Sequence, residues 1–429
     1  MQYYSTNNNA PKVNFKTATI NGQAPDKGLY FPETIPVFPK HILENIINYS
    51  NEEIAYETIK PYVGDTIPED VLKKIVAETI NFNIPLVTIT DNIFSLELFH
   101  GPTLAFKDIG ARFMSRCLSY FLKDENKKVT VLVATSGDTG GAVANGFFDV
   151  PNVDVIILYP SGKVSSVQEK QLTTLGKNIT AIEVNGTFDD CQQMVKDAFA
   201  DEDLCSKVFL TSANSINVAR WLPQQFYYFF AYKQWADKKN LPVIAVPSGN
   251  FGNICAGILA HTSGLPVNHF IAACNANDVV PNFLETNTYS PKAAVPTISN
   301  AMDVGNPSNF VRILKIFSDD VKNLKEKISA VSISDDKTKA TLKKVYETHQ
   351  YLLDPHAAVA YTALENYLKT NNEKGFIIET AHPVKFYDVV ETIINEKVTI
   401  PETVQQQLAL EKKAIFMEKG YEFLKAFLL

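Results

Sequence analysis

The sequence has few of the features that mark secreted or membrane-bound proteins. Only five of the 429 residues are cysteines, and they are widely spaced in apolar segments. An odd number of such residues is typical of reduced thiols in a cytoplasmic protein, not of a disulfide framework. The first residues lack the apolar core of a signal peptide, and no apolar run approaches membrane-spanning length. We therefore expect a cytoplasmic protein without a membrane partner.

Concentrated positive charge is also missing. The chain has 40 Lys and Arg residues against 47 Asp and Glu residues, a net charge of -7, and no basic run. A nucleic-acid backbone would require such a run. The seven histidines show no metal-ligand spacing, and no Cys-x-x-Cys occurs. We expect a small-molecule substrate, with no nucleic acid and no metal.

Hydrophobic residues make up 45% of the chain, which is ample material for two or three cores. Buried-strand patterns at residues 129–135, 153–160, 242–248 and 375–380 are each followed by a helix pattern or a turn that leads into one. Strands that alternate with helices predict an α/β fold with parallel or mostly parallel sheets flanked by helices. Ligands in such folds bind beyond the carboxyl ends of the strands.

The same pattern of strands and helices along the chain predicts a division into domains. We expect an N-terminal accessory domain over residues 1–95. A large domain would comprise residues 96–126 and 212–429, and a small α/β domain would comprise residues 127–211. The charge-rich stretch at residues 321–349 reads as a helical, solvated outer layer.

The stretch ELFHGPTLAFKD ends with a lysine in an unusual setting. The apolar residues 104–106 lead directly into Lys107, and an apolar pattern with helical spacing follows it. A lysine held against apolar surface is more readily neutral, as a Schiff-base lysine must be. The alternative is a surface lysine that flanks a core helix, and this segment by itself leaves both interpretations open.

Two glycine-rich segments follow predicted strands and open predicted helices. PSGNFGN, at residues 247–253, has the form of an anion cradle, but it lacks the GK[ST] of a P-loop and the spacing of a dinucleotide site. TSGDTGG, at residues 135–141, adds three hydroxyl groups and one acid, Asp138. The alternatives are an ordinary tight turn and a helix-start acid that stabilises the helix dipole.

A third segment, SANSINVAR at residues 212–220, places amide and hydroxyl donors ahead of Arg220. One arginine with such donors is typical of a dianion site. Taken alone, a capped helix with a surface arginine explains it better. Together with Lys107 and the two loops, it indicates a phosphorylated aldehyde cofactor and a substrate that carries a carboxylate and a phosphate.

These segments resemble those of a known family. FHGPTLAFKD, TSGDTGGAVA, PSGKVS with QEK, SANSINVAR, PSGNFGN, SNAMDV, DPHAAVAY and TAHPVKF occur in the order of the blocks of threonine synthases, which are fold-type II pyridoxal-phosphate enzymes. The chain resembles the longer form, with an N-terminal extension. The resemblance implies the cofactor pyridoxal 5'-phosphate and the conversion of O-phospho-L-homoserine and water to L-threonine and phosphate, the last step of threonine biosynthesis. We expect a monomer or weak homodimer.

The resemblance also implies roles for individual residues. Lys107 would form the Schiff base with the cofactor, and Thr380 would face its pyridine nitrogen. The cofactor phosphate would be held by Gly249, Asn250, Phe251, Gly252 and Asn253. The substrate carboxylate and the cofactor 3'-oxygen would be surrounded by Thr135, Ser136, Asp138 and Thr139. The substrate phosphate would be bound by Asn214, Ser215 and Arg220, with Lys163 near it. Many fold-type II relatives carry Asn at the position of Asp138, which leaves its contact to the cofactor open.

Three rival interpretations remain. A dehydratase or another eliminating enzyme could use the same scaffold, but its hydroxy-amino-acid substrate would need no phosphate site such as Arg220. A non-catalytic binding protein could have the same fold, although it would have no need of an intact Lys107. A nucleotide-binding α/β protein is a more distant alternative.

Overall fold

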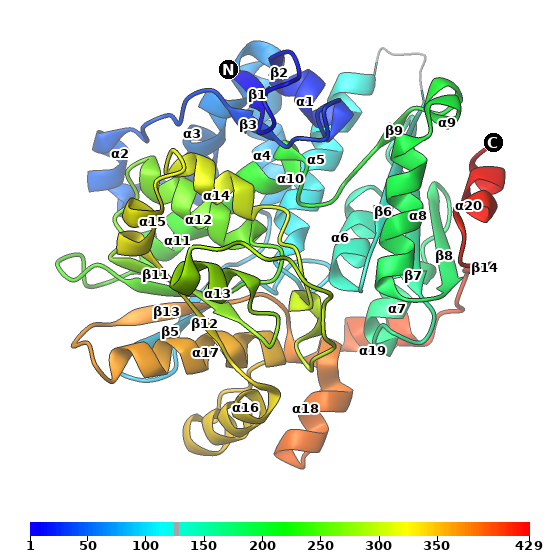
Figure 1. Ribbon diagram of the computed structural model, residues 1–429. Helices are drawn as coiled ribbons and strands as arrows, with labels where there is room; N and C mark the ends of the chain where they lie inside the picture. Colours follow the sequence, from blue (N-terminus) through cyan, green and yellow to red (C-terminus); the bar gives the residue numbers. More distant parts are fainter. Residues whose placement is uncertain (124–127) are drawn as a thin grey trace.

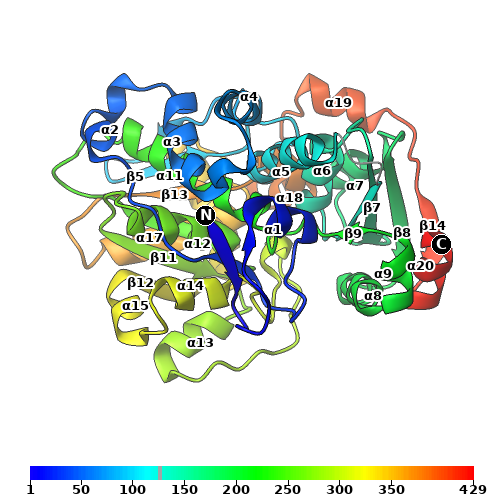
Figure 2. The same cartoon turned by 90° about the horizontal axis from the view of Figure 1, so that it is seen from above.

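The computed structural model describes residues 1–123 and 128–429. Two parts lie side by side, each built on a mostly or wholly parallel sheet, and the N-terminal elements cover one end of the larger part (Figure 1). Seen from above, the smaller part lies beside the larger one and carries the C-terminus (Figure 2). No helix within the described residues is long and apolar enough to cross a membrane.

The larger part contains a six-stranded sheet in the order β12-β11-β10-β13-β5-β4. All neighbours are parallel except the edge pair β4 and β5. Side chains alternate between two hydrophobic clusters, so both faces are buried, as parallel sheets require. Its strands are β4 (Leu86–Thr88), β5 (Ile93–Glu97), β10 (Val243–Pro247), β11 (His269–Cys274), β12 (Ile328–Ser332) and β13 (Gly375–Glu379).

The smaller part contains a fully parallel five-stranded sheet in the order β14-β8-β7-β6-β9. One of its faces shares a hydrophobic cluster with the larger part, and the other packs against helices of its own. Its strands are β6 (Val129–Ala134), β7 (Val153–Pro160), β8 (Ile179–Asn185), β9 (Leu210–Thr211) and β14 (Ile415–Glu418). The predicted α/β class with mostly parallel sheets is confirmed.

The helices that carry or cover the site follow these strands. They are α5 (Lys107–Leu122), α6 (Asp138–Gly146), α7 (Ser166–Thr173), α8 (Phe188–Ala200), α9 (Glu202–Lys207), α10 (Val218–Trp221), η3 (Leu222–Gln225), α11 (Phe226–Gln234) and α12 (Gly252–Thr262). The later ones are α13 (Val279–Thr286), η4 (Asn300–Met302), α14 (Phe310–Ile316), α15 (Val321–Lys327), α16 (Asp335–His349), α17 (Pro355–Leu368), η5 (Pro383–Phe386), α18 (Tyr387–Ile394), α19 (Glu402–Leu408) and α20 (Tyr421–Leu428).

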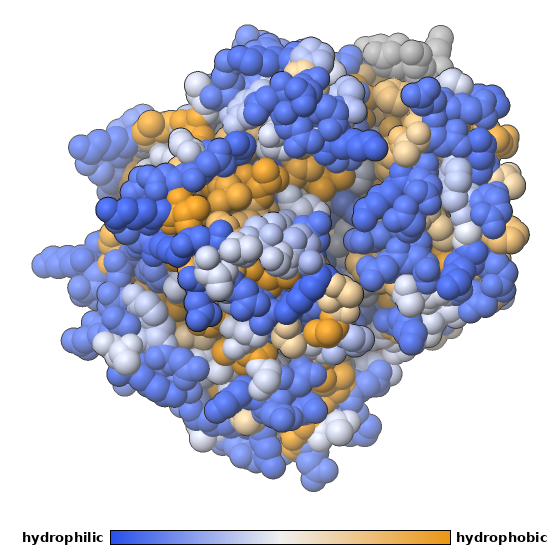
Figure 3. Space-filling model, in the orientation of Figure 1, coloured by the Kyte–Doolittle hydropathy of each residue, from blue (hydrophilic) through white to orange (hydrophobic). Residues whose placement is uncertain are grey.

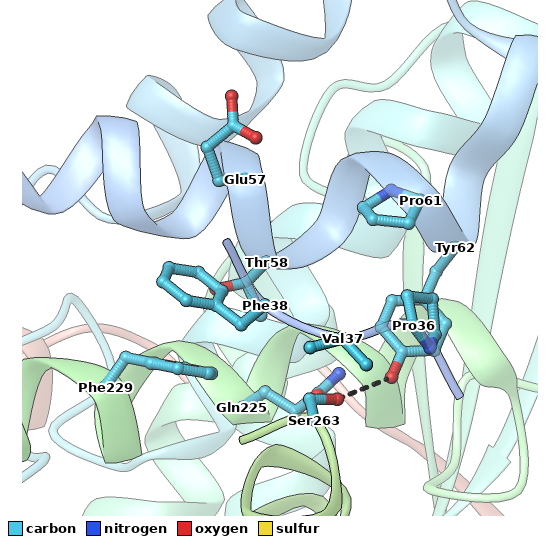
Figure 4. A pocket seen from close by; sticks show the side chains of 10 residues that line it. All are labelled: Pro36, Val37, Phe38, Glu57, Thr58, Pro61, Tyr62, Gln225, Phe229 and Ser263. Atoms are coloured by element: carbon cyan, nitrogen blue, oxygen red, sulfur yellow. Dashed lines mark hydrogen bonds between the residues drawn. The ribbon is translucent and has the colours of Figure 1, made fainter. Parts of the chain in front are cut away.

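The N-terminal elements share the main hydrophobic cluster with the larger part. They are β1 (Gln2–Ser5), β2 (Val13–Asn14), α1 (Phe15–Asn21), β3 (Tyr30–Pro32), α2 (Lys40–Glu44), η1 (Ile46–Asn48), α3 (Asn51–Val63), η2 (Gly64–Thr66) and α4 (Glu69–Thr79). At one junction the ring of Phe38 stacks on Phe229, with centroids 4.4 Å apart, and the Tyr62 hydroxyl lies 3.4 Å from Ser263 Oγ (Figure 4). The N-terminal region is therefore packed into the rest of the chain.

Three details differ from the sequence-based expectations. Residues 321–349 are not helical throughout, because β12 separates α15 from α16 and pairs with β11. The C-terminal strand β14 pairs with β8 in the smaller sheet, although residues 212–429 were all assigned to the large domain. Strands β4 and most of β5 were assigned to the accessory domain, but they belong to the six-stranded sheet. These pairings are long-range and leave no local sequence pattern.

The rest of the domain division remains a prediction, and its boundary between residues 126 and 127 lies outside the described residues. The sequence predicts that all five cysteines are core residues, but only four are buried, and Cys205 is exposed.

The surface is hollowed between the two parts (Figure 3). Segments that follow β6 and β13, one strand from each sheet, meet at the ion pair of Asp138 and Lys385, as described next.

Candidate active site

Lys107 is the first residue of α5, as the sequence predicted, and the turn before it is fastened to the end of β13. Ala105 forms an antiparallel bridge with Ala381, and Phe106 N–H donates to Thr380 O over 2.9 Å. Gly110, one turn into α5, allows α10 to approach closely, because a Cβ atom there would lie 2.5 Å from the Arg220 carbonyl oxygen. Lys107 is thereby fixed beside both Thr380 and the segment of Arg220.

The glycine-rich turn at residues 247–253 follows β10, which is the neighbour of β13 in the sheet. Strand β10 pairs in parallel with β13 up to Ala245, which lies opposite Ile377, so the segments that follow both strands leave the sheet at the same edge. Phe251 has a φ of +60°, which closes the turn, and α12 begins at the following residue. The first N–H groups of a helix have no partner within it, so this helix start can hold an anion.

The side chain of Asn250 holds this turn in place. Its Nδ2 donates to Ser215 Oγ at 2.8 Å, and its Oδ1 accepts from Ser308 N–H at 2.6 Å. Asn309 Nδ2 donates to Ser215 Oγ as well, at 3.0 Å. Asn253 turns inward, where its Nδ2 donates to the Pro247 carbonyl. The side chains therefore shape the turn, and its backbone remains available to a ligand.

The loop after β6 comes from the smaller sheet. Gly137 has a φ of +140°, and the Thr135 hydroxyl accepts hydrogen bonds from Gly137 N–H at 3.0 Å and Gly140 N–H at 2.9 Å. Within the described chain, no hydrogen bond engages the hydroxyls of Ser136 and Thr139, which are both half-buried. Thr135 therefore organises the loop, while its two neighbours offer free hydroxyls at the start of α6.

Asp138 is not an isolated helix-start acid. Its Oδ1 lies 2.8 Å from Lys385 Nζ and accepts a 2.9 Å hydrogen bond from Gln168 Nε2, and all three side chains are buried. Burial favours the neutral acid, but Lys385 and Lys107 outweigh it and hold the pKa of Asp138 well below its usual range. Asp138 is therefore an ionised carboxylate.

Arg220 is buried, and it forms no ion pair with any of the described residues. It is 3% exposed, and its Nε and Nη1 atoms are buried without a hydrogen-bond partner. Burial lowers its pKa to about 10, opposed by Asp108. A buried guanidinium without a partner is costly, so it indicates a place where an anion binds.

The Lys107 amine lies in the field of these groups. Its pKa is lowered to about 8, mainly by burial; Asp138 raises the pKa, while Lys385 and Arg220 contribute to its lowering. None of the ion pairs within the described residues includes Lys107. A fraction of the amine is therefore neutral near physiological pH, which a nucleophilic lysine requires.

Comparison with known proteins identifies the family. Residues 85–378 match the model "Pyridoxal-phosphate dependent enzyme", residues 2–80 match "Threonine synthase N terminus", and residues 357–428 match "Threonine synthase, C-terminal". A threonine synthase of Buchnera aphidicola is 45% identical over 100% of both chains. That of Escherichia coli K12 is 43% identical, over 96% of this chain and 95% of the relative. The chain belongs to the threonine synthase family.

Solved structures of threonine synthases agree with this assignment. The Escherichia coli enzyme matches with a TM-score of 0.94 and 41% identity, over 100% of this chain and 99% of that one. The pyridoxal-phosphate-bound threonine synthase of Brucella melitensis matches with a TM-score of 0.94 and 33% identity, over 100% and 98%. A tomato threonine deaminase is 16% identical with a TM-score of 0.56, so it shares only the fold.

The residues at the site fit the family's cofactor, pyridoxal phosphate. An amine with a pKa of about 8 suits its aldehyde, and the N-terminus of α12 suits its phosphate. The Thr380 side chain, only 7% exposed at the end of β13, lies between these two features in sheet order. The described residues contain no group of three or more metal-ligating side chains.

The predicted residues do not all lie as expected. The sequence predicts Ser215 beside Arg220 at the substrate phosphate, but in the structure its hydroxyl is hydrogen-bonded to Asn250 in the turn after β10. Asn214 is half-buried, with an unpartnered Oδ1. Lys163 is exposed to solvent. Of these residues, Arg220 is the buried cation that lacks a partner within the described chain.

Sequence reasoning missed two groups that shape the site. Lys385 stood within the TAHPVKF block without a role, and Gln168 is the third helical residue of a capping box that starts at Ser165, a recognisable local signal. Arg312 is also buried. It donates to the carbonyls of Ser215 and Tyr30 at 3.0 Å, and nothing local in the sequence indicates this.

Proposed function

We propose that this member of the threonine synthase family converts O-phospho-L-homoserine and water to L-threonine and phosphate. The observation that carries the proposal is the buried, unpartnered guanidinium of Arg220, close enough to lower the pKa of Lys107. A substrate with a phosphate on its side chain would supply the missing counter-ion. A dehydratase acting on serine or threonine would leave that charge unpaired.

Lys107 would hold the cofactor through its amine, and the N–H groups of Gly249, Asn250, Phe251, Gly252 and Asn253 would hold its phosphate. When bound, pyridoxal phosphate draws electrons away from the α-carbon of an amino acid. The neutral Nζ of Lys107 would remove the Cα proton, release it, and then remove the Cβ proton. After phosphate has left from Cγ, the same amine would return a proton to Cγ, and after water has added at Cβ it would return a proton to Cα. Thr380 would face the cofactor's ring nitrogen with an uncharged hydroxyl.

The other groups would bind the two ends of the substrate. Ser136 and Thr139 offer free hydroxyls at the start of α6, which suits a carboxylate. Arg220, with Asn214, would bind the phosphate and stabilise it as it leaves from Cγ. Asp138 carries the same charge as a carboxylate, so we propose that it acts on the site through Lys385. We also propose that the enzyme works in the cytoplasm.

The direct test is to incubate the pure protein with O-phospho-L-homoserine and to measure threonine and phosphate. Equal amounts of the two products are expected. Serine and L-threonine, supplied separately, should give no keto acid. Keto acid from either, with no threonine from the phosphorylated substrate, would favour the dehydratase interpretation.

Lys107→Ala tests the role of the amine. The purified variant should lose both the visible absorbance of bound cofactor and all measurable turnover, because no other amine would hold the aldehyde. Lys196→Ala, at an exposed lysine of α8, is the matched control and should retain both. Retention of the absorbance in Lys107→Ala would contradict the assignment.

A further inference from the structure

One buried ammonium group joins three segments beside Lys107. Lys385, in η5, is fully buried, and its Nζ lies 2.8 Å from both Asp138 Oδ1 and the Thr103 carbonyl oxygen. Asp138 begins α6 on the smaller sheet, and Thr103 lies four residues before Lys107. The pair therefore crosses from one sheet to the other next to the reactive amine.

Both ends of this pair are themselves held. Gln168 binds Asp138 with its Nε2 and accepts from Ser165 N–H at 3.2 Å with its Oε1. The backbone of Lys385 is fixed because its N–H donates to the His382 carbonyl at 3.0 Å. Neither charge can turn away from the other without breaking a further bond, so the pair is fixed in place.

Three side chains form hydrogen bonds with Thr103. Its carbonyl oxygen accepts from Lys385 Nζ and from Gln171 Nε2 at 3.1 Å, and its hydroxyl donates to Asp108 Oδ1 at 2.6 Å. The turn that ends at Lys107 is therefore positioned by side chains from both parts of the molecule.

We propose that Lys385 is a positioning residue that keeps Asp138 from becoming the counter-ion of Lys107. Asp138 is the carboxylate that acts on Lys107, and Lys385 and Arg220 are the cations that act on it; Asp108 in turn acts on Arg220. Because Lys385 occupies Asp138 Oδ1, the Lys107 amine is left without an ion pair and can be neutral. The proposal rests on the role of Lys107 proposed above.

Two substitutions should act in opposite directions. In Lys385→Met, Asp138 faces Lys107 alone, so the Lys107 ammonium is stabilised. In Asp138→Asn, the charged groups that act on Lys107 are all cations, so the Lys107 ammonium is destabilised. The amide oxygen of the new asparagine can still accept the hydrogen bond from Gln168 Nε2. A residue that served only to stabilise the fold would not produce shifts of opposite sign.

The readout is the reactivity of Lys107 in the full-length protein after removal of the cofactor with hydroxylamine. Acetic anhydride would label the amine over a range of pH, and mass spectrometry would quantify the peptide containing Lys107. Lys385→Met should raise the pH midpoint of labelling by about one unit, which makes labelling roughly tenfold slower at a fixed pH below the midpoint. Asp138→Asn should lower the midpoint by about as much. The double variant should return near the wild-type midpoint.

Shifts in the same direction, or no shift in Asp138→Asn, would overturn the proposal. If Lys385→Met fails to fold, as judged by circular dichroism, Lys385→Gln takes its place with the same expected direction, because it keeps a donor for the Thr103 carbonyl oxygen but carries no charge. The measurement needs no bound cofactor and no turnover. It can therefore fail while Lys107→Ala still loses the cofactor absorbance, and the two proposals remain separable.

Discussion

Arg220 and Arg312 are both buried, but their guanidinium groups have different surroundings. Arg312 lies 4.4 Å from the Trp221 ring and donates to backbone carbonyls and to Asn309 Oδ1. Among the described residues, two buried nitrogens of Arg220 have no hydrogen-bond partner, against one, Nε, of Arg312. Arg312 therefore supports the loop that holds Ser215, whereas Arg220 is free to bind a ligand.

This difference gives a prediction for a matched pair of variants. Arg220→Met should raise KM for O-phospho-L-homoserine roughly tenfold to a hundredfold, about 1.5–3 kcal/mol, because one charge-assisted anchor is lost. Its free energy of unfolding should not fall, because an unpaired buried charge is removed. Arg312→Met should instead lose about 3 kcal/mol of stability in urea unfolding, since it leaves buried carbonyls unsatisfied. Equal destabilisation of both variants would make Arg220 a structural residue.

At the scale of elements, the start of α6 depends on a conformation that only glycine adopts easily. Gly137 has φ +140° and ψ -90°, and a Cβ atom there would lie 2.4 Å from the side-chain carbon of Gln168. Gln168 is hydrogen-bonded to Asp138, so the strain would spread directly to the ion pair with Lys385.

Gly137→Ala should therefore destabilise the protein by about 2 kcal/mol or more, through backbone strain and overpacking. Gly162→Ala is the control, because Gly162 also has a positive φ, +65°, but no atom within 4 Å of the added Cβ. It should cost only about 1 kcal/mol. Urea unfolding measures both values, and a smaller loss for Gly137→Ala than for the control would contradict the prediction.

At the scale of the whole molecule, buried titrating groups couple stability to pH. The pKa of His382 is lowered from 6.5 to about 4, mainly by burial. His100 and Lys385 also lower this pKa, while Glu97 and Asp354 raise it. Between these values the unfolded chain binds a proton that the folded chain does not. Stability from this group is therefore complete above pH 6.5 and declines as pH falls towards 4.

The expected decline from His382 is at most about 3 kcal/mol. His382→Asn should flatten the fall in unfolding free energy between pH 6.5 and 4, measured by urea titration at several pH values. Asparagine keeps an acceptor for the Val384 N–H that His382 Nδ1 now binds at 3.1 Å. A variant with the same slope as the wild type would show that the decline has another source.

The sequence by itself determined the alternation of strands and helices, the start of α5 at Lys107 and the two glycine-rich turns. These features are local: apolar periodicity and glycine at strand ends act within a few residues. The sequence also determined the family, since its blocks follow the family's order along the chain. The positions of the site residues at the carboxyl ends of parallel strands followed from the fold class.

Only the tertiary structure decided how distant charges pair. Asp138 and Lys385 come from different sheets, and nothing in either local segment indicates their contact. The same holds for β14 in the smaller sheet and for the bonds of Arg312 to distant carbonyls. A side chain's partner depends on which surfaces packing brings together, and that is a property of the whole chain. The sequence therefore supplied the reactive amine, and the packing determined the charges around it.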